Sequence, residues 1–314
     1  MRITNSMMIS GFLTNLNNNT MKLDKYGTQL SSNKKISRIS QNPVGMISSL
    51  NARQRLNGYR QYQENLTLAR NWVDQTETSL MDISSNLTEI KEQLTRASTG
   101  TMTPSDKKNV AVLLREYKDH IMQSLNMTMG DRYIFGGFNV NSAPFADNAG
   151  VIEYNGIDLG DTTPGNMALI TAEQQNRIQF EIGYELSMEL SFTGIDIAGI
   201  GSDNVFVVLD DIINELESGT PDNTVLSGYI ANMTKLQDNV MSKIVVVGSR
   251  STKLDLLENR YSQDIIDYEQ IKSNIEDVDQ AEAIMYLKMA EVVYRQSLSV
   301  GGRVIQPTLM DYLR

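Results

Sequence analysis

The sequence predicts a mainly α-helical protein with a small β insert, in which both chain ends form an antiparallel helical bundle. Three features support this fold class: a long heptad stripe in each half of the chain, and a stretch of strict two-residue alternation between them. A single amphipathic helix cannot bury its own seam, so each stripe needs a partner helix. We therefore expect the two halves to pack together as a coiled-coil rod, with the β insert as an outer domain.

Both stripes follow alternating steps of three and four residues. In the first, nine of ten positions are apolar, whereas the 40% hydrophobic content of the chain would fill about four. Its members are Leu66, Ala69, Val73, Thr76, Leu80, Ile83, Leu87, Ile90, Leu94 and Ala97. The second, with one polar exception, consists of Leu254, Leu257, Tyr261, Asp264, Tyr268, Ile271, Ile275 and Val278. The first stripe predicts one helix from about Ala52 to Ala97.

The N-terminal segment is polar and rich in asparagine up to about residue 40. A weak heptad there predicts a marginal helix that needs a partner. Asn42-Pro43 disfavours helix at the residue before the proline, so we expect a turn over residues 37–45. Further along, Thr103 should cap a helix that begins at Pro104, has Asp106 in its first turn and ends near Gly130.

The insert is predicted from alternation. Every even position from Ile178 to Phe192 is apolar, which is typical of one long strand, or of a hairpin turning near Gly183, with one buried face. Residues 151–156 predict another strand and turn. Helix should resume at residues 202–218, continue over 223–247, and start again after Gly248. Beyond Val278 the heptad shifts to Ala283, Leu287, Ala290 and Tyr294.

Composition argues against several functional classes. The chain has 314 residues, a net charge of −10, no cysteine and one histidine, so disulfides, thiolate chemistry and His- or Cys-based zinc sites are excluded. No basic run suggests nucleic-acid binding, and no stretch of 18 apolar residues suggests a membrane span. The start of the chain lacks the apolar region of a secretory signal, which by itself indicates a cytosolic protein.

Candidate catalytic residues are few. His120 is better explained as a helix-surface residue than as a titrating switch. The acidic residues Asp210, Asp211, Glu215 and Glu217 lack the glycine and the terminal glutamate of a calcium loop, and the pair Asp277 and Asp279 lacks a third carboxylate. We predict no enzyme activity and no cofactor or metal.

The expected domains combine distant segments. Residues 1–44 and 281–314 should form terminal helices that are disordered in the monomer, residues 45–137 and 205–280 the bundle, and residues 138–204 the outer β domain. The predicted assembly interface on the terminal helices consists of Phe12, Leu16, Leu23, Tyr26, Leu30, Ala283, Leu287, Ala290, Tyr294, Leu309 and Leu313. The predicted bundle core consists of Leu66, Val73, Leu80, Leu87, Leu94, Leu254, Leu257, Tyr268 and Ile275.

Several segments resemble motifs of the flagellin superfamily. They are Gln29–Ser37, Asn42–Gly45, Gly248–Arg250 and Ile275–Glu282. Asn33 replaces the usual glycine, an exchange that suits a positive φ, and Gln41-Asn42 replaces the usual aspartate pair. Arg132–Gly137 with Ala143–Phe145, the opening Met1–Ile3 and the ending Leu309–Arg314 are similar to the proteins of that superfamily at the hook–filament junction.

This resemblance implies an extracellular, non-enzymatic adaptor of the bacterial flagellum, exported unfolded by the flagellar type III system without a cleavable signal peptide. It implies contacts with hook-associated protein 1 on the hook side, flagellin on the filament side, copies of itself in a ring, and an export chaperone. The alternative is a short flagellin, the filament subunit itself. A cytosolic coiled-coil scaffold also agrees with the helix pattern, whereas a flagellin carrying a metalloprotease insert needs H-E-x-x-H, which one histidine rules out.

Overall fold

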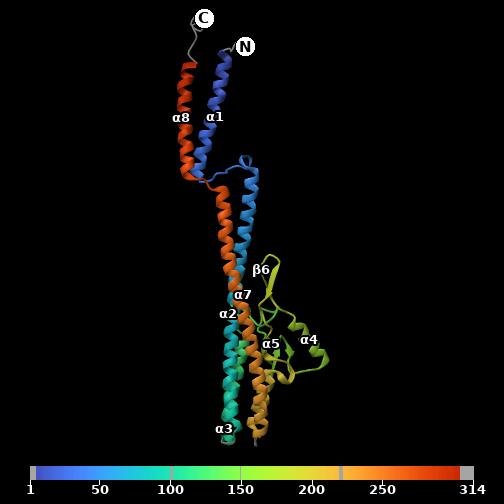
Figure 1. Cartoon of the computed structure of the whole chain (residues 1–314). Helices are drawn as coiled ribbons and strands as arrows, with labels where there is room; N and C mark the ends of the chain where they lie inside the picture. The colour runs from blue at the N-terminus through green and yellow to red at the C-terminus, as the bar shows by residue number, and fades with distance from the viewer. Residues whose placement is uncertain (1–4, 100–101, 149, 219–221, 305–314) are drawn as a thin grey trace. The chain divides into compact units, whose positions relative to one another are not determined.

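The computed structural model describes residues 5–99, 102–148, 150–218 and 222–304, and long helices dominate it (Figure 1). The predicted fold class, mainly α with a small β insert, is confirmed. The helices are α1 (Asn5–Ser32), α2 (Pro43–Ser98), α3 (Pro104–Leu125), α4 (Pro164–Gln174), α5 (Gly194–Ala198), α6 (Val205–Glu217), α7 (Asn223–Glu276) and α8 (Gln280–Val304), with short 3-10 turns η1 (Ile39–Gln41) and η2 (Gly201–Asp203).

Strands are short and antiparallel. They are β1 (Thr128–Met129), β2 (Arg132–Tyr133), β3 (Phe145–Asn148), β4 (Val151–Tyr154), β5 (Ile157–Asp158), β6 (Gln179–Gly183) and β7 (Leu186–Glu189). Among the described residues β1 pairs with β2, β3-β4-β5 form a three-stranded sheet, and β6 pairs with β7. The hairpin alternative for residues 178–192 is thus the correct one, with its turn between Gly183 and Leu186. The expected strand and turn at residues 151–156 is confirmed as β4 and the turn into β5.

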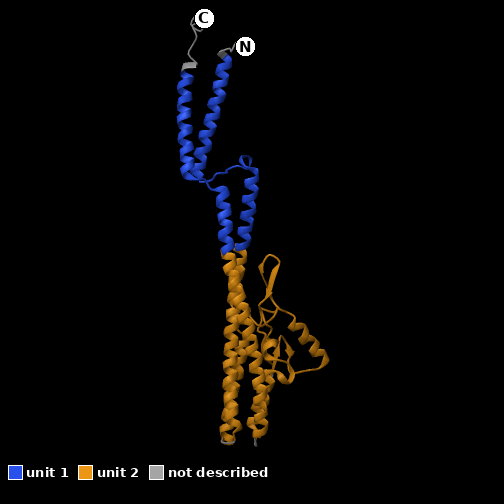
Figure 2. Cartoon of the chain, viewed as in Figure 1, with its two compact units in different colours: residues 1–59, 263–314 blue, residues 60–262 orange. Residues whose placement is uncertain are grey.

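The chain divides into two compact units, which Figure 2 colours separately. Unit 1 comprises residues 1–59 and 263–314, and unit 2 comprises residues 60–262. Both α2 and α7 therefore contribute residues to each unit, and the β insert belongs to unit 2. The three-domain division expected from the sequence stays a proposal about how these parts act in an assembly.

The core of unit 2 contains the first heptad stripe. All ten of its residues are at most 3% exposed, and the polar member, Thr76, donates its hydroxyl to the Trp72 carbonyl at 2.7 Å. On α3 and α6, fully buried partners such as Leu114 and Leu209 complete this core. Each fully buried leucine contributes about 1.5–3 kcal/mol, so these residues dominate the stability of unit 2.

The second stripe is buried less completely. Leu254 and Tyr261 are buried, whereas Leu257, Tyr268 and Ile275 are half-buried. Ile271 is 45% exposed, so the regular spacing overstates how much of α7 faces a partner.

The start of α2 and the continuity of α7 differ from those expected. α2 begins at Pro43 rather than near Ala52, because the Asn42 side chain accepts the backbone N–H of Gly45 at 3.0 Å and proline suits the first helical position. α7 runs unbroken through Gly248, where a glycine costs about 1 kcal/mol relative to alanine, too little to end so long a helix. The short helices α4 and α5 were not expected.

The cap of α3 is confirmed. Thr103 accepts the backbone N–H of Asp106 at 3.3 Å, and the Asp106 carboxylate accepts the backbone N–H of Thr103 at 3.1 Å. The Thr103 hydroxyl, which donates to the same carboxylate at 2.7 Å, and the Thr103 backbone N–H hold the pKa of Asp106 below its usual value. The helix ends at Leu125, before the expected Gly130, where Asn126 turns the chain into β1.

We expect Thr103→Ala to lower the free energy of unfolding of unit 2 by about 1 kcal/mol, because the backbone N–H of Asp106 loses its acceptor and the Asp106 carboxylate loses the Thr103 hydroxyl. Urea denaturation followed by circular dichroism measures this. Ser105→Ala, an exposed change one residue before Asp106, is the control and should stay within about 0.5 kcal/mol. Equal effects of both changes would contradict the cap.

An aromatic cluster anchors the insert in unit 2. Phe145 meets the rings of Tyr154 at 5.2 Å and Phe206 at 5.7 Å between centroids, and the buried Tyr154 hydroxyl donates to the Phe135 carbonyl at 2.9 Å. Burial raises the pKa of Tyr154. A Cβ at Gly194 would lie 2.4 Å from the Phe145 ring, so only glycine fits against this cluster.

The β6–β7 hairpin is held on α2 and α7 by side chains that reach its backbone. The Asn65 amide donates to the Glu181 carbonyl at 2.8 Å, and the Tyr261 hydroxyl donates to the Ile182 carbonyl at 2.7 Å. Arg250 donates to the Leu190 carbonyl at 3.0 Å. These side chains give the hairpin's carbonyl groups the hydrogen-bond donors that further strands would provide in a larger sheet.

Candidate assembly interface

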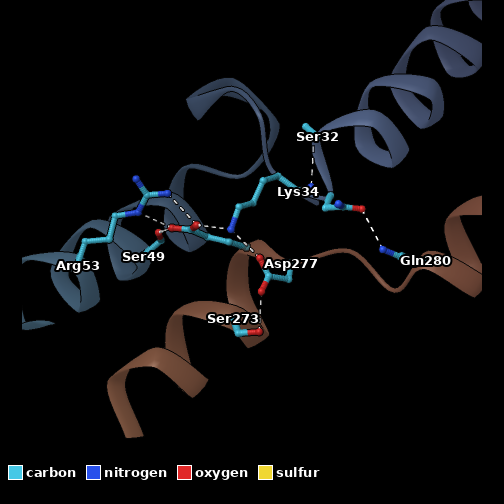
Figure 3. A network of polar contacts seen from close by, with 9 residues as sticks. Ser32, Lys34, Ser49, Arg53, Ser273, Asp277 and Gln280 are labelled. Atoms are coloured by element: carbon cyan, nitrogen blue, oxygen red, sulfur yellow. Dashed lines mark hydrogen bonds and ion pairs between the residues drawn. The ribbon is translucent and has the colours of Figure 1, made fainter. Parts of the chain in front are cut away.

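Two of the flagellin-like motifs, Gln29–Ser37 and Ile275–Glu282, meet in unit 1. The linker between α1 and α2 lies against the break between α7 and α8, as Figure 3 shows. The Lys35 N–H donates to the Glu276 carbonyl at 2.6 Å, and the Val278 N–H donates to the Asn33 carbonyl at 3.2 Å. Asn33 has φ 56°, which confirms the expected positive φ, and accepts from the Gln280 side chain at 3.0 Å. The two ends of the chain are thus joined by backbone and side-chain bonds.

Glu276 is the centre of this junction. Its carboxylate is 3% exposed and accepts both Nε and Nη2 of Arg53 at 2.7 Å. The Lys34 ammonium lies 3.1 Å from it, and the Ser49 hydroxyl also donates to it. The hydrogen bonds from Arg53, followed by those of Ser49 and Lys34, outweigh burial and lower the pKa of Glu276 to about 2. Glu276 is therefore ionised at neutral pH, and three side chains donate to its carboxylate.

Asp277 extends the junction. Its carboxylate lies 2.6 Å from the Lys34 ammonium and accepts the Ser273 hydroxyl at 2.7 Å. The bond to Lys34 holds the pKa of Asp277 below its usual value and raises that of Lys34. Asp279 instead accepts the backbone N–H groups of Ala281 and Glu282 and so caps the start of α8. Asp277 and Asp279 therefore both have structural roles.

Acid should open this junction. Because the pKa of Glu276 is lowered from 4.5 to about 2, the stability it contributes is complete above pH 4.5 and is lost as the pH falls toward 2. We expect the difference in unfolding free energy between wild type and Glu276→Gln to shrink over that window. Urea denaturation at pH 7, 4.5, 3 and 2 measures the difference. A gap that stays constant over this range would contradict the low pKa.

The predicted interface residues of the terminal helices lie along the seam between α1 and α8. Ala283 is 2% exposed. Phe12, Leu16, Leu23, Tyr26, Leu30, Leu287, Ala290 and Tyr294 are half-buried, and Leu309 and Leu313 lie outside the described residues. The rings of Tyr26 and Tyr286 stack at 5.3 Å, and the Asn19 amide donates to the Ser297 hydroxyl at 2.9 Å. These residues join α1 to α8 within one chain, and their role between chains stays a prediction.

The seam between α1 and α8 explains why residue 301 is a glycine. A Cβ at Gly301 would lie 2.3 Å from the Phe12 ring, so the aromatic side chain packs directly on the α8 backbone. The structural role of Gly301 is to let α1 and α8 approach closely.

A second apolar face on the terminal helices was missed by counting one stripe per helix. Large exposed apolar residues on α1 are Met7, Met8, Leu13 and Met21, and on α8 they are Ile284, Met285, Met289, Val292, Val293, Leu298 and Val300. Their signal on α8 was a second apolar repeat with a spacing of four residues, formed by Met285, Met289 and Val293. Extended exposed apolar surfaces mark interaction sites, so the pair has a buried seam and a free face.

Other candidates have structural explanations. His120 is exposed, with Nδ1 2.8 Å from the Asn86 amide. Lys118 lies 2.5 Å from Asp210, which pairs an acidic residue of α6 with α3. Within the described parts of the chain no three acidic or histidine residues gather as a metal site. In the same parts no helix is long and apolar enough to cross a bilayer.

Comparison with known proteins shows what the chain is similar to. Residues 3–139 match the family described as the bacterial flagellin N-terminal helical region, so this part of the chain is flagellin-like, and the resemblance to the flagellin superfamily is confirmed. Over 309 residues the chain is 24% identical to flagellar hook-associated protein 3 of Salmonella typhimurium, covering 95% of each chain. The predicted likeness to this protein, also called FlgL, is confirmed.

Solved structures share the fold. A flagellar hook-associated protein from Vibrio parahaemolyticus matches with a TM-score of 0.65 and 20% identity, covering 76% of this chain and all of the other. The flagellar junction protein FlgL from Legionella pneumophila matches with a TM-score of 0.57 and 14% identity, covering 74% and 100%. At these identities the matches show a common fold.

Proposed function

We propose that this chain is a non-enzymatic structural adaptor of the bacterial flagellum that joins the hook to the flagellin filament. The observation that carries the proposal is the terminal helix pair, which is closed on one side by its own seam and apolar on the other. Such a pair is suited to bury its free face against neighbouring subunits. The similarity to hook-associated protein 3 over 95% of the chain supports the junction as the place of assembly.

The proposal includes the partners. Hook-associated protein 1 would bind on the hook side, flagellin on the filament side, and copies of this chain beside it in a ring. Because one face of each subunit must meet a different face of the next, the contacts are heterologous.

The chain would leave the cell unfolded through the flagellar type III system, with an export chaperone covering α8 beforehand. A short flagellin is not favoured, because the whole-length relatives are hook-associated proteins.

Gene deletion tests this function. We expect cells without the gene to carry intact hooks without filaments and to release flagellin monomers into the medium. Electron microscopy and an immunoblot of the medium detect both. Expression of the wild-type chain from a plasmid should restore filaments, which is the control for effects on neighbouring genes. Normal filaments in the deletion strain would contradict the proposal.

A further inference from the structure

The start of α2 in unit 1 is apolar on two sides. Toward the interior, Ala52 and Leu56 are 3% exposed, and Ser49 is fully buried. On the opposite side, Val44, Ile47 and Leu50 are 76%, 60% and 49% exposed. A helix that buries one face normally carries polar residues on the other. This second apolar face therefore has no role within unit 1.

Basic residues flank this face along the chain. Ile39 in the preceding turn is 63% exposed, Lys35 and Arg38 are exposed before the face, and Arg55 is exposed after it. Among the described residues none of these three cations has an ion-pair partner, and the sequence from residue 25 to residue 63 contains seven basic and no acidic residues. We call Lys35, Arg38, Ile39, Val44, Ile47, Leu50 and Arg55 the basic patch.

A complementary region exists in the same sequence. Residues 133–234, which hold the β insert and α6, contain fifteen acidic residues and one basic residue, Arg177. Two of the acidic residues, Asp210 and Glu217, pair with α3, and Asp196 and Glu189 pair with Arg177. Most of the others, such as Asp147 and Glu185, are exposed, and so are the apolar side chains of Phe138 and Tyr184, at 64% and 75%.

We propose that the basic patch of one copy docks on the acidic region, residues 133–234, of a second copy. This inference rests on the proposed ring of subunits, and it identifies one contact between neighbouring copies in that ring. An apolar centre with a cationic rim fits a surface of opposite charge that also exposes apolar side chains, and the rim sets the register. Unit 1 of each subunit thus meets unit 2 of its neighbour, as a heterologous contact requires.

Because the chain has no cysteine, one introduced cysteine reports the contact. Ser48→Cys, at the exposed edge of the patch, is expressed in the deletion strain, and isolated flagella are labelled with benzophenone maleimide and irradiated. We expect a product of twice the 35.2 kDa chain mass, with the crosslink in residues 133–234 of the second copy. A crosslink to another protein, within one chain, or to another segment would overturn the proposal, as would no crosslink from a labelled and assembled subunit.

Charge reversal supplies a second measurement. Lys35→Glu, Arg38→Glu and Arg55→Glu together should reduce the crosslink yield about tenfold, because attraction becomes repulsion. Lys108→Glu, Arg132→Glu and Lys253→Glu, which reverse three exposed cations outside the patch, are the matched control and should leave the yield unchanged. Equal losses in both triple variants would overturn the contact.

The outcomes for the two proposals are distinguishable. If the chain is absent from isolated hook–filament structures, the proposed function fails. If the chain is present but position 48 does not reach residues 133–234 of a second copy, only the docking contact fails. Circular dichroism of each purified variant excludes misfolding as the cause.

Discussion

Replacing Glu276 with alanine is expected to lower the free energy of unfolding of unit 1 by about 3 kcal/mol. The change leaves the Arg53 guanidinium and the Lys34 ammonium without their shared carboxylate, and it frees the buried Ser49 hydroxyl. Removing one partner of a buried pair costs about 3–5 kcal/mol. The lower end applies here because Arg53 and Lys34 are 52% and 38% exposed and can regain water.

Urea denaturation followed by circular dichroism at pH 7 measures this loss. Glu291→Ala is the control, because Glu291 pairs with Lys288 on the surface of α8, where such pairs contribute about 0.5 kcal/mol or less. Glu276→Gln should fall between the two, since the amide keeps one acceptor but no charge. A loss for Glu276→Ala as small as that for Glu291→Ala would mean that the junction does not hold the two ends together.

Replacing Leu80 with alanine is expected to cost unit 2 about 3 kcal/mol. Leu80 lies in the middle of the first stripe and is fully buried. The truncation removes buried methyl groups and leaves a cavity between long helices that cannot collapse locally, for which the usual cost is about 2–5 kcal/mol.

The control for Leu80 is on the same helix. Leu68 is 54% exposed, so Leu68→Ala changes the same residue type in the same secondary structure without making a cavity. It should stay within about 0.5 kcal/mol. The midpoint of thermal unfolding and the urea transition both measure the difference. If the two variants unfold alike, the stripe around Leu80 is not the core of unit 2.

Structural features with a repeating sequence pattern could be predicted from the sequence. The stripe from Leu66 to Ala97 was expected to be buried because ten positions repeat a single spacing, and all ten are buried. The cap at Thr103 was predictable because its signal lies within four residues. By contrast, Gly248 was expected to separate two helices, since local propensity does not show how much the flanking turns stabilise α7.

The junction could not be predicted in its details. Lys34 and Glu276 are 242 residues apart, and a single lysine or glutamate carries no pattern that names its partner. The resemblance to the flagellin superfamily pointed to the two motifs that contain Lys34 and Glu276. The fold shows that these motifs occur together because they bind each other. The terminal helices show a related limit. Phe12 and Tyr26 follow one apolar repeat, and Met285 and Met289 follow another. Only the structure shows that the first pair lies in the buried seam and the second pair on the free face.

The most direct test of the adaptor function is the position of the chain in isolated flagella. An antibody against the purified protein, coupled to gold and viewed by electron microscopy, should label one short band where the hook meets the filament. The deletion strain carrying an empty plasmid provides the unlabelled control. Labelling along the whole filament would instead identify a filament subunit, and labelling absent from intact flagella would contradict any structural role there.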